Sequence, residues 1–150
     1  MYEAQGRDDR RKMYADAVGV DCIDGPGVDL VLNLEWPLPE GLGQFDHVEC
    51  RSVLEHSHKP WRLAENIERL MAPGATLDLS VPFVWSLHAY PSDLYRFTAE
   101  GVKAIFPGIQ WTALLYANNT LSDGGKTPRK SIDGHVYIAR TEVLGWGVKC

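Results

Sequence analysis

The stretch "FDHVECRSVLEHSHKPWRLAENIERLMAPGATLDLSVPF", residues 45–83, decides the fold. Its two ends, 45–50 and 75–83, are apolar runs typical of buried strands, and the second is apolar enough to be buried on both faces. Between them, apolar residues recur with the spacing of one helix face, after Pro60 and before Pro73, which suit the start and the end of a helix. The residues on that face are Leu63, Ile67, Leu70 and Met71. A strand, a helix and a second strand in this order predict a βαβ crossover in a parallel sheet.

The flanking sequence extends this pattern in both directions. Further strand-like runs lie at 17–21, 28–35, 109–117 and 135–146. Thr98 is predicted to be the N-cap of a short helix. The last two strand-like runs predict an antiparallel hairpin with a long loop at 118–134. The predicted fold is therefore α/β, a mostly parallel sheet with a C-terminal antiparallel hairpin, in a single domain over 1–150.

Composition narrows the classes of partner. The formal charge of -5, from 15 basic and 20 acidic residues, offers no broad positive surface for a phosphate backbone, so we expect no nucleic-acid partner. No stretch approaches the roughly 18 apolar residues needed to span a bilayer, so we expect no membrane partner. Cys22, Cys50 and Cys150 lack the spacing of a zinc site and the even number of a disulfide framework, which favours a reducing, cytoplasmic location.

The order of motifs resembles the class I S-adenosylmethionine-dependent methyltransferases, in particular their type 11 group. The matching motifs are "GVD" (19–21), "NLEWPLP" (33–39), "FDHVECRSVLEH" (45–56), "RLMAPGATLDLSVPF" (69–83) and "HAYPSDLYRFT" (88–98). The resemblance implies a Rossmann-like fold, S-adenosylmethionine as cofactor, and methyl transfer to a small molecule or sugar.

The resemblance also implies a set of cofactor-binding residues. Asp21 and the adjacent Cys22 would meet the ribose, because a carboxylate offers two acceptor oxygens to the ribose hydroxyls and ligands bind beyond the carboxyl ends of strands. Asn33 and Leu34 would contact the adenine, and Cys50 and Arg51 would lie under the methionine end. The alternatives are a solvated acid at Asp21, a simple turn at 33–34 and a small buried hydrophobe at Cys50.

The front of the chain departs from the family. The glycine-rich loop of the first strand has room only in "YEAQGRDDR" (2–10), where Glu3 and Gly6 would stand for its acidic residue and one of its glycines. We therefore expect a fold truncated on its N-terminal side, and a catalytically inactive binding or assembly module is the alternative function. A truncated front would leave Val18 and Val20 less shielded from solvent. We therefore expect a second subunit to cover them in a homo-oligomer.

The segment "SVLEHSHKPW" (52–61) raises the question of a metal site. His56 and His58 are two residues apart and would point away from one another on a helix, and the sequence fixes no third ligand near them. We therefore predict no metal, and a histidine metal hydrolase ranks last among the functions considered. Glu55 and His56 are assigned to the rim of the cleft.

The segment 88–98 supplies the predicted acceptor site. A hydroxyl acceptor must lose its proton during methyl transfer, and His88 is the predicted base because imidazole accepts a proton near neutral pH. Asp93, Tyr95 and Arg96 would orient His88 or hold the acceptor. The alternative is an ion pair of Arg96 with Asp93 that only supports the loop.

Overall fold

A computed structural model of the chain describes residues 10–88, 92–118 and 141–150. The chain divides into two compact units, Met1–Leu34 and Glu35–Cys150. None of the helices in the described ranges is long and apolar enough to cross a membrane. The predicted 118–134 loop lies almost wholly outside the described residues.

The first unit contains a 3-10 turn, η1 (Arg10–Met13), and two parallel two-residue strands, β1 (Val20–Asp21) and β2 (Leu30–Val31). The predicted strands 17–21 and 28–35 are therefore too long. Gly19 is bonded both to β2 and to the turn before it, and the Leu30 N–H donates to the Gly19 carbonyl at 3.0 Å. Its carbonyl accepts from the backbone N–H of Asp29 at 2.8 Å, and its own N–H donates to Asp29 Oδ2 at 2.7 Å.

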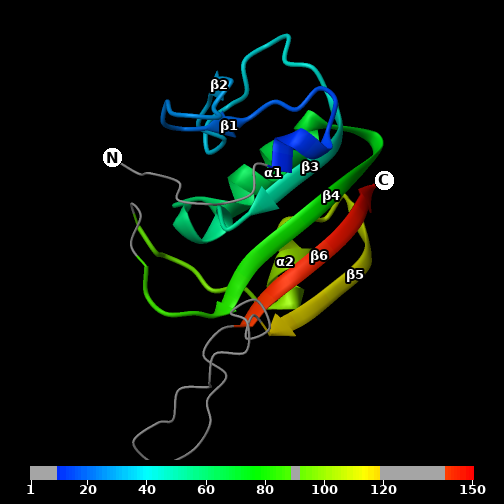
Figure 1. The fold of residues 1–150 in the computed structure, drawn as a ribbon. Helices are drawn as coiled ribbons and strands as arrows, with labels where there is room; N and C mark the ends of the chain where they lie inside the picture. Colours follow the sequence, from blue (N-terminus) through cyan, green and yellow to red (C-terminus); the bar gives the residue numbers. More distant parts are fainter. Residues whose placement is uncertain (1–9, 89–91, 119–140) are drawn as a thin grey trace, which may run out of the picture. The chain divides into compact units, whose positions relative to one another are not determined.

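The second unit is built on a four-stranded sheet in the order β3-β4-β6-β5 (Figure 1). Its strands are β3 (Phe45–Arg51), β4 (Met71–Val84), β5 (Ile109–Asn118) and β6 (Thr141–Lys149). β3 and β4 are parallel and joined through α1 (Pro60–Leu70), which confirms the predicted crossover. β6 pairs antiparallel with both β4 and β5, so the terminal hairpin is also confirmed.

The expectation of a mostly parallel sheet is confirmed only in part for the residues that the structure describes. Across both units there are two parallel and two antiparallel strand pairings, and the four-stranded sheet is mixed. The hairpin inserts β6 between β4 and β5, which makes two of the three pairings in that sheet antiparallel. Met71, predicted on the helix, instead opens β4 opposite Phe45.

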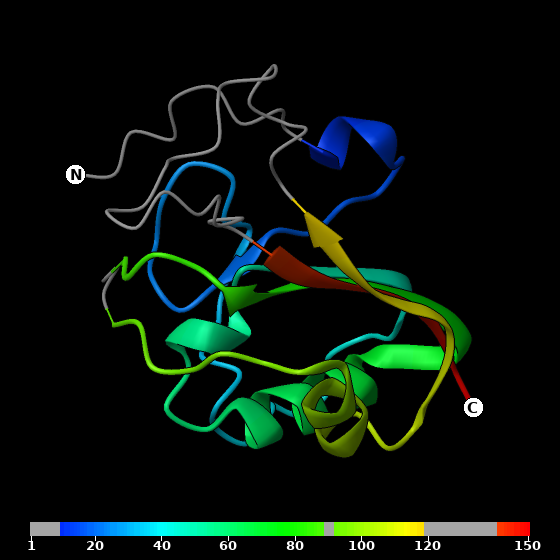
Figure 2. The ribbon, with the colours of Figure 1, turned by 90° about the horizontal axis from the view of Figure 1, so that it is seen from below.

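The core of the second unit lies between β4 and the two helices. Figure 2 shows α1 and α2 (Ala99–Ile105) on one side of the sheet. β4 is buried continuously from Leu77 to Pro82, as expected for a strand covered on both faces. Thr98 caps α2 as predicted, accepting from the Gly101 N–H at 3.0 Å. Aliphatic and aromatic side chains of the two helices, and Phe106 directly after α2, are buried in this core. They are Leu63, Ala64, Ile67, Leu70, Val102 and Phe106.

Glycines in β6 make room for a tryptophan of the neighbouring strand. A Cβ on Gly145 would lie 2.5 Å from Trp111 Cζ3, and one on Gly147 would lie 2.3 Å from Ile109 Cγ2. The Trp111 ring in turn meets Phe106 edge-on, with ring centroids 6.0 Å apart. β6 can therefore sit between its neighbours only with hydrogen atoms at these positions.

Candidate active site at the carboxyl ends of β3 and β4

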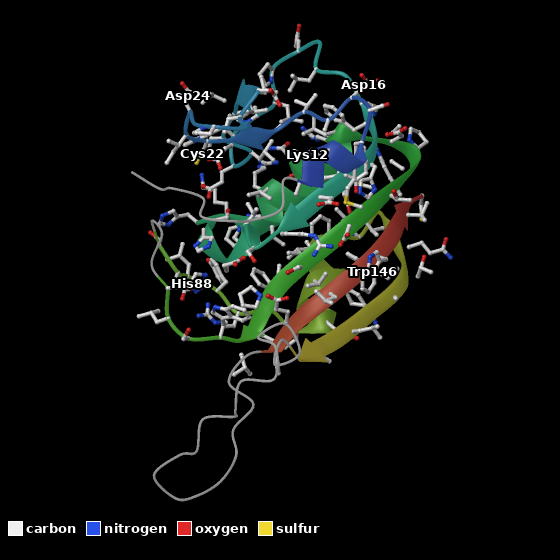
Figure 3. The ribbon with its side chains drawn as sticks, in the orientation of Figure 1. Lys12, Asp16, Cys22, Asp24, His88 and Trp146 are labelled. Atoms are coloured by element: carbon white, nitrogen blue, oxygen red, sulfur yellow. The ribbon has the colours of Figure 1, made fainter. Side chains whose placement is uncertain are left out.

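Because β3 and β4 are parallel neighbours, their carboxyl ends meet at one edge of the sheet, where ligands bind in open α/β folds. β3 turns at Ser52, whose φ of 53° is left-handed, and continues into the short turn η2 (Leu54–His56). β4 continues into the loop that carries His88 (Figure 3). A left-handed non-glycine residue is uncommon, and it is held here by a 2.9 Å hydrogen bond from its N–H to the Ser80 carbonyl.

Three side chains converge at this edge: Glu55, His56 and His88. Glu55 Oε1 lies 3.7 Å from His56 Nε2 and 3.9 Å from His88 Nε2, and the two imidazole rings meet edge-on with centroids 5.1 Å apart. The Glu55 side chain is only 1% exposed, so its assignment to the rim of a cleft is wrong. The sequence did not fix a third group near His56, and in the structure the loop after β4 brings His88 to it.

Glu55 is a buried carboxylate. Its burial raises the pKa of its carboxyl above the usual range, while the neighbouring imidazoles of His56 and His88 act in the opposite direction. Oε2 of Glu55 is buried and has no hydrogen-bond partner among the described residues. Such a group is costly to bury unless something else compensates it.

Both histidines are oriented through the same ring nitrogen. His56 Nδ1 lies 2.5 Å from the carbonyl oxygen of Ser92, and His88 Nδ1 lies 3.2 Å from that of Ser86 and 3.3 Å from Asp93 Oδ2. A carbonyl oxygen only accepts, so each imidazole carries a proton on Nδ1 when it makes this bond. Nε2 is then the ring nitrogen on the side of Glu55.

The predicted acceptor residues Asp93 and Arg96 form a bidentate ion pair. Arg96 Nη1 lies 2.5 Å from Asp93 Oδ1, and Nη2 lies 2.7 Å from Oδ2. Asp93 Oδ2 also accepts from the His88 N–H at 2.9 Å, and the hydrogen bonds from Arg96 hold the pKa of the Asp93 carboxyl well below its usual range. The pairing that the sequence left as an alternative is present, and it positions His88.

The rest of the loop is tied to Glu55 and β4 through its backbone. The N–H groups of Leu94 and Tyr95 donate to the Glu55 carbonyl at 2.8 and 3.3 Å, and that of Phe97 donates to Pro82 at 2.9 Å. Phe97 is buried beside Tyr95, with ring centroids 6.0 Å apart. Tyr95 therefore belongs to the packing of this loop as well as to the predicted site.

The connector "SHKP" (57–60) answers the question about its second histidine. Glu35 Oε1 accepts from Ser57 Oγ and from the His58 N–H, each at 2.8 Å, which fixes the approach to α1. The His58 side chain is exposed and does not belong to the group of possible metal ligands formed by Glu55, His56 and His88. Sequence reasoning missed this role of Glu35.

The predicted cofactor residues fall into both units. In the first, Asp21 and Cys22 lie at the end of β1, and Asn33 and Leu34 follow β2. Asp21 is exposed, and its Oδ1 accepts from the Ile23 N–H at 3.0 Å. Glu3 and Gly6 lie outside the described residues.

Cys50 and Arg51, the predicted residues of the second unit, end β3. Cys50 is buried, and that burial, together with the nearby charge of Glu55, raises the pKa of its thiol to about 12, so it packs as a small hydrophobe. Arg51 Nη2 lies 2.5 Å from Asp78 Oδ2, and its Nε lies 3.8 Å from Glu49 Oε2. Arg51 is thus held along the sheet by two carboxylates.

Comparison with solved structures finds proteins of similar fold, although comparison of sequences finds none. No family model matches the chain, and no curated protein of similar sequence was found. A chain in the complex between the Haloferax volcanii Trm112 methyltransferase activator and a methyltransferase superposes with a TM-score of 0.63 at 16% identity, over 93% of this chain and 75% of that one. The chain therefore shares the fold of this solved methyltransferase complex.

Two further structures with the methyltransferase fold set the range of this likeness. N-methyltransferase NodS from Bradyrhizobium japonicum WM9, in complex with S-adenosyl-L-homocysteine, gives a TM-score of 0.57 at 8% identity, over 87% of this chain and 64% of NodS. The 16S rRNA (adenine(1408)-N(1))-methyltransferase from Catenulisporales acidiphilia gives 0.51 at 18% identity, over 83% and 64%. This chain thus spans less than two thirds of either protein.

At these identities the likeness is one of fold, an α/β Rossmann-like architecture. The acceptor differs among proteins that share it, so the chemistry must be argued from the site. The signal for the converging side chains was present in the sequence: "LEH" (54–56) follows one predicted strand, and His88 follows its parallel neighbour. Carboxyl ends of adjacent parallel strands meet, which places both segments together.

Proposed function

We propose that this protein is an S-adenosylmethionine-dependent methyltransferase that acts on a hydroxyl group of a small molecule or sugar. The fold supports the reaction class, and the structural neighbour NodS was solved with S-adenosyl-L-homocysteine. The observation that carries the proposal is the convergence of Glu55, His56 and His88 at the carboxyl edge of two parallel strands. Oriented imidazoles at this edge suit an acceptor that must lose a proton.

The first unit supplies residues that fit a nucleoside. β1 and β2 are parallel, with Asp21 opposite Val31, so Asp21 and Asn33 follow neighbouring strands at the same edge of that small sheet. Asp21 is exposed, as a residue that binds ribose hydroxyls must be, and Cys22 and Leu34 would line the same place. Glu3 and Gly6 complete the proposed set. Cys50 is buried, so its role is to pack beneath the end of β3 and not to contact the cofactor.

When bound, S-adenosylmethionine supplies a methyl group activated by its sulfonium. The carbon–sulfur bond breaks as a carbon–oxygen bond forms, which leaves S-adenosylhomocysteine and requires the acceptor hydroxyl to release its proton. His88 takes that proton on Nε2, because its Nδ1 is engaged by Ser86 and Asp93. Arg96 and Asp93 hold His88 in place through their ion pair.

A small acceptor is favoured by charge. A chain with a formal charge of -5 has little attraction for a phosphate backbone. One structural neighbour is an rRNA methyltransferase, so the fold alone does not decide between acceptor classes. The discriminating measurement is competition: unlabelled RNA added to a binding assay should leave the affinity for S-adenosylhomocysteine and the turnover of a sugar acceptor unchanged.

Calorimetric titration with S-adenosylmethionine and S-adenosylhomocysteine tests the cofactor assignment. Asp21→Ala should weaken binding at least about tenfold, because it removes hydrogen bonds to a charged acceptor, each of which contributes roughly 1.5–3 kcal/mol. Asp16→Ala, another exposed acid of the first unit, is the matched control and should bind as the parent does. Absence of heat with both ligands in the unaltered chain would favour the inactive binding module instead.

We also propose that the protein forms a homo-oligomer. Val18 and Val31 of the first unit are 45% and 54% exposed in the isolated chain, and apolar strands of this kind are ordinarily covered. Light scattering during size-exclusion chromatography at micromolar concentration should give a mass above that of one chain. A monomer mass would contradict this.

A further inference from the structure

The side chains of Glu55, His56 and His88 converge without bonding one another directly. The separations from Glu55 Oε1, 3.7 Å to His56 Nε2 and 3.9 Å to His88 Nε2, are longer than a hydrogen bond. One ligand atom from each of the three lies within 4.8 Å of the others. Around a tetrahedral ion with bonds of about 2.0–2.2 Å, neighbouring ligand atoms are separated by roughly 3.3–3.5 Å. Small side-chain rotations therefore suffice to close the cluster around one ion.

The surroundings of the histidines are those of metal ligands. A ligating imidazole ordinarily uses its other ring nitrogen to donate to a carbonyl or a carboxylate, which fixes the ring and its tautomer. His56 does this with the Ser92 carbonyl, and His88 with the Ser86 carbonyl and Asp93. Asp93 is itself fixed by Arg96.

The carboxylate provides a second, independent indication. The Glu55 side chain is only 1% exposed, yet its Oε2 has no hydrogen-bond partner among the residues described. A buried carboxylate oxygen without a donor is expensive, and a bound cation is one of the few groups that compensates it. Arg96, a cation of the same loop, already forms a bidentate ion pair with Asp93.

We propose that Glu55, His56 and His88 bind one divalent transition-metal ion of the Zn²⁺ class. Two imidazoles and one carboxylate form a donor set that favours such ions over Mg²⁺ or Ca²⁺, which prefer all-oxygen coordination. Three protein ligands leave at least one coordination position for an exogenous oxygen, as in catalytic zinc sites.

Resting on the proposed methyl transfer, the metal site also specifies how the acceptor is activated. An ion held by Glu55, His56 and His88 would bind the acceptor oxygen and lower the pKa of its hydroxyl, so that the proton could pass to solvent before methyl transfer. Nε2 of His88 cannot coordinate an ion and accept a proton at once, so the base role proposed above applies to the protein without a metal, and a bound ion would replace it. The acceptor class becomes an alcohol or phenol whose oxygen can bind a metal.

Titration of the full chain, stripped with a chelator, with Zn²⁺ in a competition assay tests the site. We expect one equivalent of Zn²⁺ per chain, and Co²⁺ substitution should give the visible absorption of a low-coordinate nitrogen and oxygen site. Mg²⁺ at equal concentration should not compete. Absence of stoichiometric Zn²⁺ binding, or equal binding of Mg²⁺, would overturn the proposal.

Variants locate the ion. His88→Ala and Glu55→Gln should each weaken Zn²⁺ binding by at least about a hundredfold, more than the 10–100-fold typical of outer-sphere changes. His58→Ala is the matched control, since this exposed histidine lies two residues from His56 but outside the cluster, and its affinity should stay within about twofold of the parent. Equal losses in His58→Ala and His88→Ala would contradict the assignment.

A thermal readout guards against variants that merely fold poorly. Zn²⁺ should raise the melting temperature of the unaltered chain and of His58→Ala, and leave that of Glu55→Gln unchanged. An equal rise in Glu55→Gln would overturn the site. Metal binding is measured without S-adenosylmethionine, and cofactor binding with chelator present, so failure of one proposal is distinguishable from failure of the other.

Discussion

The two units of the chain hold their proposed functional residues by different means. In Glu35–Cys150, Glu55, His56, His88 and Asp93 are fixed by a buried sheet, a bidentate ion pair and hydrogen bonds to backbone carbonyls. In Met1–Leu34, Asp21 ends and Asn33 follows a strand of only two residues, and among the described residues all the buried apolar ones lie in the other unit. The proposed acceptor site is thus built into the core, whereas the proposed cofactor residues depend on turns.

The largest expected effect is on the core of the second unit. Gly145→Ala places a Cβ 2.5 Å from the Trp111 ring and 2.9 Å from Leu114, which forces the packing between β5 and β6 to shift. We expect a loss of about 3 kcal/mol in the free energy of unfolding, as for overpacked cores. Urea denaturation measures it. Gly43→Ala is the control, because a Cβ there meets nothing within 4 Å; equal stability of the two variants would contradict the packing argument.

This core is also the part of the fold that the sequence predicted well. Helical spacing after Pro60 and the unbroken apolar run of β4 reflect burial, which periodicity reports directly. The bounds at Met71 and the short β1 and β2 were missed, because they depend on one register shift and on the Gly19 turn, which leave no periodic signal. The share of parallel pairings in the sheet was overestimated, because it depends on where the hairpin inserts, which periodicity does not report.

The second prediction concerns the ion pair beneath the proposed acceptor site. Arg96→Met leaves Asp93, whose side chain is 1% exposed, without its cation, and should cost about 2 kcal/mol because an unpaired buried charge is destabilising. Denaturant midpoints report the change. The control is Arg62→Met, which breaks an exposed pair with Glu65 and should cost no more than about 0.5 kcal/mol. Similar costs in the two variants would show that the Asp93 site is solvated.

The residues of this site were only partly predictable. His88, Asp93, Tyr95 and Arg96 were expected on one loop because they stand close together in the sequence. Their convergence with Glu55 depends on the path of two loops after β3 and β4, fixed by hydrogen bonds such as Leu94 to the Glu55 carbonyl. The burial of Glu55 follows from that path and has no signature in a segment as short as "LEH".

A smaller effect should separate binding from stability in the first unit. A Cβ on Gly19 would lie 1.9 Å from the Gly27 carbonyl oxygen, so Gly19→Ala must displace the turn that sets β1 and β2. We expect the affinity for S-adenosylhomocysteine to fall about tenfold, which corresponds to 1.4 kcal/mol, while the melting temperature changes by less than about 2 °C. Gly25→Ala, where a Cβ meets nothing within 4 Å, should alter neither. A large loss of stability in Gly19→Ala would mean that the first unit also supports the core.

The smallest expected effect is at Glu68 of α1, a residue that belongs to neither proposed site. Its Oε1 accepts from the Gly108 N–H at 2.9 Å, and burial raises the pKa of its carboxyl. A raised pKa means that the folded state binds the proton more tightly, so this group favours folding below its unfolded pKa of about 4.3 and ceases to do so as the pH rises through the folded value. Glu68→Gln keeps the hydrogen-bond acceptor for the Gly108 N–H and removes the titrating carboxyl.

At neutral pH the Glu68→Gln substitution should therefore change the free energy of unfolding by no more than about 0.5 kcal/mol, with a slight gain expected. The difference between the variant and the parent should shrink as the pH is lowered below 5, where the parent carboxyl is also neutral; a difference that grows on acidification would show that the Glu68 charge stabilises the fold.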